Sequence, residues 1–431
     1  MRTTDAPPRV LGRTGAVLMS VNGIVGAGIF ALPALLHAKV GAFAPWLFLI
    51  FGLLYAAIIL VTARLATMFK SSGGLQLYIE AAFGPFAGFQ AGWLIILNFA
   101  SSRAATLYVL ISYLAVIFPG LEDALTRGIA LALLVAGLTA LTASGTKSSI
   151  GGLGIGTLLK FAPILLFCVV AIGSGGIATE ARLPDFGTLE SVALLVFFAF
   201  NGVNSATFAA GEFRDPQRDV PITMLASLGI VTLLYMVVQW AYVASGAPGG
   251  DGDAAPLATA AGAVLGPQGT LLLTFAAVFS IAANALTFYI AGGRLLYGMA
   301  ERGLLPATLA RISPRFGTPV LAIVAFSCLV AIMLASGAFA FLAAVGGLGS
   351  QIITLAMTAA FVLLVRRSQQ GSGKGLAMLW WPVIAVSFGF AVWTIWQAPA
   401  AGYALLAALL GLGTALYAIA GAGRSRRTQD P

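Results

Sequence analysis

The sequence has very few charged side chains. Lys, Arg, Asp and Glu make up 9% of its 431 residues, whereas about a quarter of the residues in an ordinary soluble domain are charged. Hydrophobic residues make up 60% of the chain, which leaves too little polar surface to cover a soluble fold. This composition excludes soluble enzymes, secreted scaffolds and, despite a net charge of +9, nucleic-acid binding. We therefore expect an integral membrane protein surrounded by the lipid bilayer.

Histidine and cysteine are almost absent as well. The chain has one histidine, His37, and two cysteines, Cys168 and Cys328, which lie in apolar runs. A metal centre or an intramembrane enzyme would need several ligands, or a nucleophile with its base, at the depth of the bilayer. The sequence therefore predicts no bound metal, no cofactor and no enzyme activity. An intramembrane enzyme is kept only as a distant alternative.

Twelve apolar stretches are long enough to cross a bilayer. A membrane helix needs about 20 mainly apolar residues, because each backbone polar group must be paired within the segment. The sequence predicts an all-α membrane protein with transmembrane helices near residues 14–38, 43–69, 85–117, 128–145, 153–176, 190–211, 221–245, 267–299, 319–336, 340–365, 377–396 and 402–421.

Basic residues are distributed unevenly between the connecting segments. With the N-terminus inside, 18 Lys and Arg residues lie in cytoplasmic segments, and only Lys39, Arg127 and Arg182 lie in external ones. Cytoplasmic loops of membrane proteins carry such an excess. We expect a multi-pass protein of the cytoplasmic (inner) membrane with both termini in the cytoplasm. The two remaining basic residues, Arg103 and Lys160, fall inside predicted spans.

Two spans contain segments that a continuous membrane helix would not favour. Residues 22–30 (NGIVGAGIF) lie in the first span, and residues 198–205 (FAFNGVNS) lie at a similar depth in the sixth. Glycine also permits close packing between continuous membrane helices, so the glycines alone do not distinguish a packing contact from a helix break. The pairing of the two segments favours discontinuous helices, whose free N–H and C=O groups bind charged groups.

This pairing predicts two inverted repeats of five helices. The first repeat would cover residues 14–176 and the second residues 190–365. Two further helices would follow at 377–421, with cytoplasmic segments at 1–13 and 422–431.

Four sequence blocks, in order, resemble amino-acid permeases of the amino acid–polyamine–organocation superfamily, which have the LeuT-type fold. The blocks are residues 23–30 (GIVGAGIF), 72–85 (SGGLQLYIEAAFGP), 202–221 (GVNSATFAAGEFRDPQRDVP) and 294–306 (RLLYGMAERGLLP). The resemblance runs from about residue 11 to 365. It implies alternating access around a central site between the first, third, sixth and eighth spans.

The resemblance also implies roles for individual residues. The first block supplies substrate-binding residues that hold the α-carboxylate on backbone N–H groups, and an unwound segment at residues 198–201 supplies carbonyls for the α-amino group. Phe198 is implied as an aromatic gate and Phe288 as a substrate-facing aromatic, while Glu212 and Arg214 are implied as cytoplasmic gate partners. The substrate-binding residues are Ile24, Gly26, Ala27, Gly28, Phe198, Ala199, Phe200, Asn201 and Phe288, together with Arg103. Arginine-exchanging relatives have a glutamate where this chain has Asn204, which argues against proton coupling through a carboxylate there.

Arg103 and Lys160 are the two ionisable residues deep within predicted spans, where such residues are usually paired or functional. The resemblance implies that Lys160 takes the place of a sodium ion and contacts the free carbonyls of the first helix. A snorkelling lysine is the alternative. For Arg103 the sequence offers no acid deep in any span, so its expected partners are the substrate, backbone carbonyls or the end of a broken helix. A purely structural arginine is also open.

The same shortage of buried acids constrains the substrate. A cationic substrate would need a buried carboxylate to offset its desolvation. We expect a secondary transporter of amino acids that works by sodium-independent exchange or proton coupling and favours neutral amino acids. The alternative is an acidic amino acid with Arg103 as its counter-ion. The expected partners are the small-molecule substrate and the lipid bilayer. The sequence leaves open whether the chain also forms a homo-oligomer.

Overall fold

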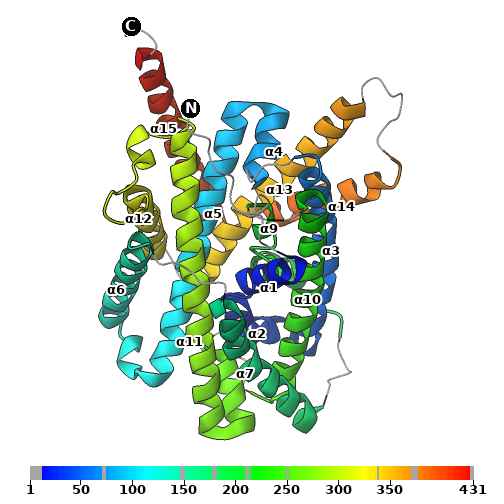
Figure 1. Ribbon diagram of the computed structural model, residues 1–431. Coiled ribbons are helices and arrows are strands. Elements are labelled where there is room, and N and C mark those ends of the chain that lie inside the picture. Colours follow the sequence, from blue (N-terminus) through cyan, green and yellow to red (C-terminus); the bar gives the residue numbers. More distant parts are fainter. Residues whose placement is uncertain are drawn as a thin grey trace.

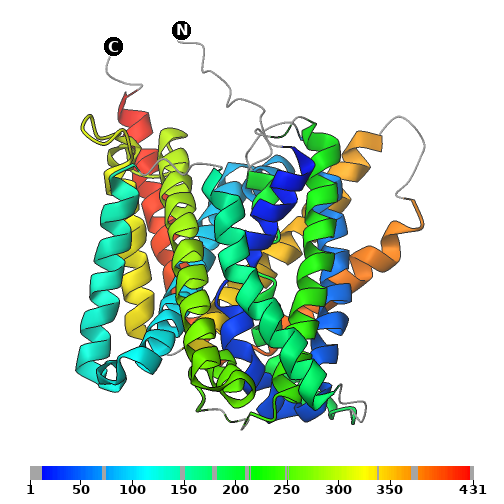
Figure 2. The ribbon, with the colours of Figure 1, turned by 60° about the horizontal axis from the view of Figure 1, so that its bottom comes forward.

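A computed structural model describes residues 12–69, 74–145, 151–176, 182–208, 213, 215–247, 250, 252–336, 339–369 and 377–427. All long elements in these ranges are α-helices, and most run roughly lengthwise in Figure 2, whereas α14 lies obliquely to them (Figures 1 and 2). The helices are α1 (Arg13–Ile24), α2 (Gly28–Val40), α3 (Ala44–Ala66), α4 (Gly74–Phe83), α5 (Pro85–Ile117), α6 (Ala124–Ala143), α7 (Gly151–Gly175), α8 (Phe186–Ala199), α9 (Ser205–Phe208), α10 (Pro216–Ala244), α11 (Pro256–Glu301), α12 (Val320–Ser336), α13 (Phe339–Gln369), α14 (Trp380–Trp396) and α15 (Ala400–Arg427).

Within the described residues, seven helical stretches are long and apolar enough to cross a membrane. Four shorter apolar helices accompany them, at Leu159–Gly175, Phe186–Ala199, Val320–Ala335 and Trp380–Trp396. An all-helical chain with this many apolar helices is a multi-pass membrane protein. The helix α1 begins and α15 ends at the same end of the molecule (Figure 2).

Local sequence explains where several helices begin. The carboxylate of Asp185 accepts a hydrogen bond from the Thr188 backbone at 3.0 Å and so caps α8. Hydrogen bonds from the Thr188 side chain and backbone hold the pKa of Asp185 below its ordinary value. Proline occupies the first turn of α5, α10 and α11, where a missing N–H costs nothing.

The helix α5 forms the centre of the bundle. In its most apolar window 89% of the residues are buried, whereas the corresponding value is 11% for α6 and 17% for α15. The helices α11 and α13 pack along α5, and α3 packs against α10. The outer helices α6 and α15 therefore present most of their apolar surface to lipid.

Two helices are interrupted in the middle of the bundle. Residues 25–27 separate α1 from α2, and we call this segment the first break. Residues 200–204 separate α8 from α9, and we call this segment the second break. Both lie in the segments that the sequence predicts to be discontinuous.

The second break starts later than the resemblance implies. Phe198 and Ala199 still belong to α8, whereas the expected unwound segment was 198–201. The N–H groups of Phe200 and Asn201 donate to the carbonyls of Phe197 and Phe198 at 3.1 and 3.0 Å, which tightens the last turn. The chain then turns at Gly202, whose φ of +103° is open to glycine and unfavourable for other residues.

Two helical pieces were not expected from the apolar pattern. The helix α4 lies in the segment between the second and third predicted spans. The helix α11 begins at Pro256, and Gly266 kinks it with a φ of 70°. The predicted span 267–299 therefore covers only the part of α11 beyond the kink.

Candidate functional site

Lys160 on α7 binds the carbonyl end of α1 at the first break. Its ammonium is buried, with 4% of the residue exposed. It donates to the carbonyl of Asn22 at 3.2 Å and to the carbonyl of Val25. The carbonyl end of a helix carries partial negative charge, so a cation at this place is electrostatically favourable.

Two neutral side chains from other helices bind the remaining carbonyls of this end. The hydroxyl of Tyr235 on α10 donates to the carbonyl of Ile24 at 3.3 Å. The amide nitrogen of Asn284 on α11 donates to the carbonyl of Gly23 at 2.9 Å. Together with Lys160, these residues pair the carbonyls that the interruption of the helix leaves without intrahelical partners.

Arg103 on α5 lies on the other side of Asn284. Its guanidinium donates to the Oδ1 atom of Asn284, and its Cζ atom lies 4.1 Å from the centre of the Phe288 ring. Only 6% of the residue is exposed. The sequence predicted the substrate, a backbone carbonyl or a helix end as the partner, whereas the direct partner is a side-chain amide that itself binds the end of α1.

Sequence reasoning missed Asn284. A signal was present, because Asn284 precedes Phe288 by four residues, and such residues share one face of a helix. An amide in an otherwise apolar run, one turn from a predicted substrate-facing aromatic, indicates a polar contact inside the bundle.

The two breaks pack against each other through glycines. A Cβ atom at Gly28 would lie 3.1 Å from the Ala199 Cα, and one at Gly202 would lie 3.2 Å from the Gly23 carbonyl oxygen. A Cβ atom at Gly26 would lie 3.0 Å from Asn284 Oδ1. Larger side chains at Gly28 or Gly202 would push the two broken helices apart, and one at Gly26 would displace Asn284 of α11.

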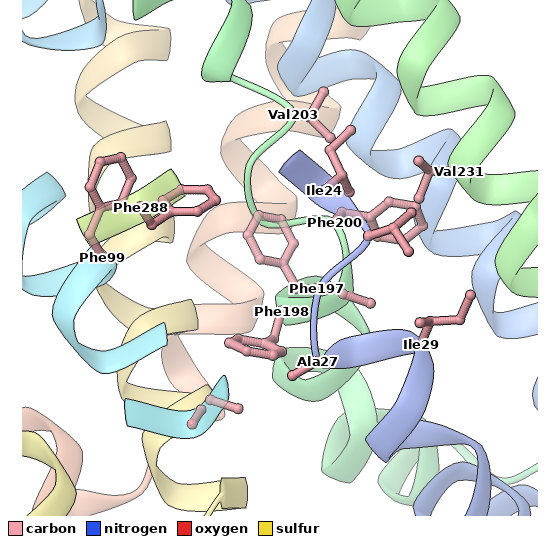
Figure 3. Packing of buried hydrophobic residues seen from close by; sticks show 14 of the residues in the cluster. Ile24, Ala27, Ile29, Phe99, Phe197, Phe198, Phe200, Val203, Val231 and Phe288 are labelled. Carbon is pink, nitrogen blue, oxygen red and sulfur yellow. The ribbon is translucent and has the colours of Figure 1, made fainter. Parts of the chain in front are cut away.

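The aromatic residues near the second break have different surroundings. Figure 3 shows Phe198 beside Ala27 and Phe200 turned toward Val231. The Phe200 ring is fully buried and stacks on Tyr55, with 5.7 Å between the ring centres. Its side chain is therefore part of the packed core, and only its backbone can contact a ligand.

A small cavity lies beside the second break. Its lining residues include Asn201 and Phe288 from the predicted site, and its volume is about 40 Å³, which is room for roughly two or three water molecules. The lining residues are Ile58, Thr62, Leu75, Ile95, Asn98, Phe99, Asn201, Gly202, Asn204, Ser205, Phe288, Ser350, Ile353, Thr354 and Met357, none of which is charged. An amino acid is larger than this cavity, so it could enter only if the surrounding helices moved apart.

Amides and hydroxyls form the polar side of this cavity. The Asn201 amide nitrogen donates to Ser102 Oγ at 2.7 Å and to Asn98 Oδ1 at 3.2 Å. The Asn98 amide nitrogen donates in turn to the Gly346 carbonyl at 2.6 Å. Among the described residues, Asn204 Oδ1 has no hydrogen-bond partner. The cavity thus offers uncharged polar groups next to apolar ones.

The predicted site residues fall into three groups. Asn201 and Phe288 line the cavity. Arg103 contacts Phe288 and Asn284, and the first-break residues adjoin α8 and Asn284. The predicted gate partners Glu212 and Arg214 lie outside the described residues.

Two ion pairs occur among the described residues. Arg13 at the start of α1 pairs with Asp219 in the first turn of α10, with 2.6 Å between Nε and Oδ1. Arg302 after α11 pairs with Glu80 on α4. These pairs join cytoplasmic segments in the predicted topology.

At the other end of the bundle, Tyr113 on α5 joins two segments. Its hydroxyl donates to the Phe30 carbonyl on α2 at 2.9 Å and accepts from the Leu257 N–H on α11 at 3.1 Å. This single hydroxyl connects α5 to the second half of the first broken helix and to the start of α11.

The sequence is similar to known transport proteins. The family model described as amino acid permease matches residues 11–416. The chain is 29% identical to an uncharacterized transporter of Mycobacterium tuberculosis, over 96% of this chain and 92% of the relative. It is 26% identical to the methylthioribose transporter of Bacillus subtilis, over 95% of this chain and 92% of the relative. It is also 26% identical to the serine/threonine exchanger SteT of Bacillus subtilis, over 73% of each chain.

Proposed function

This chain belongs to the amino acid permease family, and on that premise we propose that it carries neutral amino acids across the cytoplasmic membrane by sodium-independent alternating access. It is a transporter and not an enzyme. Exchange or proton coupling would drive it.

The order of the helices supports a LeuT-type fold with twelve spans. If α1 with α2, and α8 with α9, each count as one span and α4 is left out, the helices give twelve. The first repeat then runs from α1 to α7, the second from α8 to α13, and each begins with a broken helix. Both termini then lie in the cytoplasm, as the distribution of Lys and Arg favours.

The residues that line the cavity are the main support for the proposed preference for neutral substrates. Amides and hydroxyls lie beside Phe99, Phe288 and Met357, and no charged side chain is among the lining residues. A charged substrate side chain would lose its hydration there without gaining a counter-ion. A small neutral amino acid offers both the polar and the apolar groups that such a wall can bind.

Lys160 supports sodium independence. Its ammonium already donates to two carbonyls of the α1 end. Such carbonyls are typical ligands of sodium in transporters with broken helices. The Lys160 ammonium thus supplies the positive charge that a bound sodium ion would otherwise supply to these carbonyls.

Acidic amino acids are the second candidate, because Arg103 is a buried cation. Its guanidinium is not among the lining residues of the cavity, and its contacts are Asn284 and Phe288. This arrangement supports the neutral class over the acidic one.

A thermal-unfolding panel on the purified protein tests the proposal. Each proteinogenic amino acid, and methylthioribose as a comparison, would be added separately in sodium and in choline buffers. A ligand that binds the folded state raises its unfolding temperature. We expect shifts from small neutral amino acids that are equal in both buffers. Shifts from lysine or arginine alone, or shifts that require sodium, would contradict the proposal.

A further inference from the structure

The centre of the bundle holds a buried cation that has no carboxylate partner among the described residues. Arg103 is 6% exposed, and among the described residues its Nε atom has no hydrogen-bond partner. Neither of the ion pairs in these residues involves it. Burying a charge without a counter-ion is costly, and an anion beside the guanidinium would offset that cost. A ligand with a negative charge would supply the counter-ion that the described residues do not give Arg103.

The amide of Asn284 lies between this cation and the end of α1. Its Oδ1 atom accepts from the guanidinium, and its Nδ2 atom donates to the Gly23 carbonyl at 2.9 Å and to the Asn22 carbonyl at 3.4 Å. A guanidinium can only donate and a carbonyl can only accept, so these two neighbours fix which way the amide faces.

The amide also fills the space beside the first break. A Cβ atom added at Gly26 would lie 3.0 Å from Asn284 Oδ1 and 3.4 Å from Nδ2. Gly26 belongs to the first break, so a substrate bound at this break would lie against the amide. A carboxylate brought to Gly26 would thus meet the Asn284 side chain first.

The polar ends of this amide match those of an α-amino acid. An α-amino acid has a donor, its ammonium, and an acceptor, its carboxylate, on the same carbon atom. The Asn284 amide has a donor directed at the end of α1 and an acceptor directed at Arg103. It therefore takes the partners that the two charged groups of a substrate would take.

From these contacts we infer that the Asn284 amide holds the groups that would bind the substrate's α-ammonium and α-carboxylate, and that a bound substrate displaces it. The ammonium takes the Gly23 carbonyl, and the carboxylate takes Arg103 beside Gly26. The inference rests on the proposed transport of amino acids, and it assigns Arg103 to the carboxylate that all amino acids share instead of to an acidic side chain.

Displacement is electrostatically favourable. A carboxylate on a guanidinium makes charge-assisted hydrogen bonds, which are about twice as strong as those of a neutral amide. The ammonium likewise replaces a neutral donor at the partly negative end of α1. Both exchanges convert weaker contacts into stronger ones.

Binding measurements on Asn284→Ala test the inference through the sign of the effect. The probes are L-serine, L-leucine and any other amino acid that binds the unaltered protein. Removal of the amide leaves Gly23 and Arg103 unpaired only in the empty protein, so we expect the Kd to fall about tenfold, which corresponds to roughly 1.4 kcal/mol. An Asn284 that merely braces the fold would leave the Kd unchanged, and one that binds the substrate would raise it. Either result would overturn the inference.

Asn284→Asp provides a second variant of nearly the same shape. Its carboxylate would pair permanently with Arg103 and would remove the donor to Gly23, so we expect the Kd to rise at least tenfold. Unchanged binding in this variant would also overturn the inference. Thr287→Ala is the matched control, because Thr287 lies one turn further along α11, is exposed and bonds only its own helix at Ala283.

Analogues of serine separate the two contacts. Ethanolamine lacks the carboxylate and 3-hydroxypropanoate lacks the ammonium. Arg103→Gln should weaken the binding of serine and of 3-hydroxypropanoate and leave that of ethanolamine unchanged; equal losses for all three would count against the assignment. If no amino acid binds the unaltered protein, the proposed function itself fails. If amino acids bind it and Asn284→Ala weakens them, only this inference fails.

Discussion

The Lys160 ammonium on α7 donates a hydrogen bond to the Asn22 carbonyl on α1, 3.2 Å away, and so ties a scaffold helix to the interrupted end of the first helix. A second bond runs to the Val25 carbonyl. Lys160 and Asn22 are 138 positions apart in the sequence, so their contact depends on the tertiary arrangement of α1 and α7.

Lys160→Met should lower the stability of the folded protein and abolish uptake. Methionine keeps an apolar stem of similar length and removes the donor, which leaves buried carbonyls unpaired at a cost of about 1–3 kcal/mol. Thermal unfolding and uptake into proteoliposomes measure the two effects. Lys39→Met, an exposed lysine at the end of α2, is the control. Full uptake by Lys160→Met would show that the contact is dispensable.

Tyr113→Phe should open the end of the bundle at which α2 and the start of α11 meet. The hydroxyl bridges the Phe30 carbonyl and the Leu257 N–H, and its loss leaves both groups unpaired. At a net cost of about 1 kcal/mol, the population of the open form should rise about fivefold. A cysteine placed at the buried Ala34 of α2, in a protein lacking Cys168 and Cys328, should then react faster with a thiol reagent from that side. An unchanged rate would exclude a gating role for the hydroxyl.

Gly202→Ala, in the second break, should reduce uptake more than an alanine substitution at a glycine of an outer helix. The φ of +103° is strained for alanine, and the new Cβ would lie 3.2 Å from the Gly23 carbonyl oxygen. We expect at least a tenfold loss of transport with a smaller loss of expression. Gly137→Ala on α6 is the control, since nothing lies within 4 Å of its Cβ position. Equal activity of the two variants would argue against contact between the breaks.

The positions of the helices were predictable because the bilayer imposes a strong pattern on the sequence. The predicted span 85–117 coincides with α5, and the predicted start at 267 coincides with the kink of α11 at Gly266. The helix α4 was missed because it is short and lies outside the apolar runs. Hydropathy reports what faces lipid and says little about short helices between spans.

The partners of the buried charges were only partly predictable. An isolated Arg103 in an apolar run indicates a partner, but Asn284 lies 181 positions away and its hydrophobic neighbours conceal it. The extent of the second break depended on the last turn of α8, where Phe200 and Asn201 keep short-range hydrogen bonds. Such details follow from backbone geometry and tertiary packing, which composition and spacing do not determine.

The pair formed by Arg13 and Asp219 makes a prediction about non-additive effects. Asp219 is 4% exposed, and besides Arg13 it accepts a bond from the Asp215 N–H at 3.3 Å. Arg13→Ala leaves a buried carboxylate without its counter-ion, and we expect it to lower stability by about 1–3 kcal/mol. Asp219→Asn leaves an exposed arginine that water can solvate, so its cost should be smaller.

The double variant Arg13→Ala, Asp219→Asn should therefore be more stable than Arg13→Ala alone, because a neutral amide does not need the lost charge. Thermal unfolding of the two single variants, the double variant and the unaltered protein gives the coupling between the residues. Two single effects that simply add would show that the pair contributes little. A positive coupling would show that the start of α1 is held to α10 by this charge pair, which the first half of the broken helix would have to release in order to move.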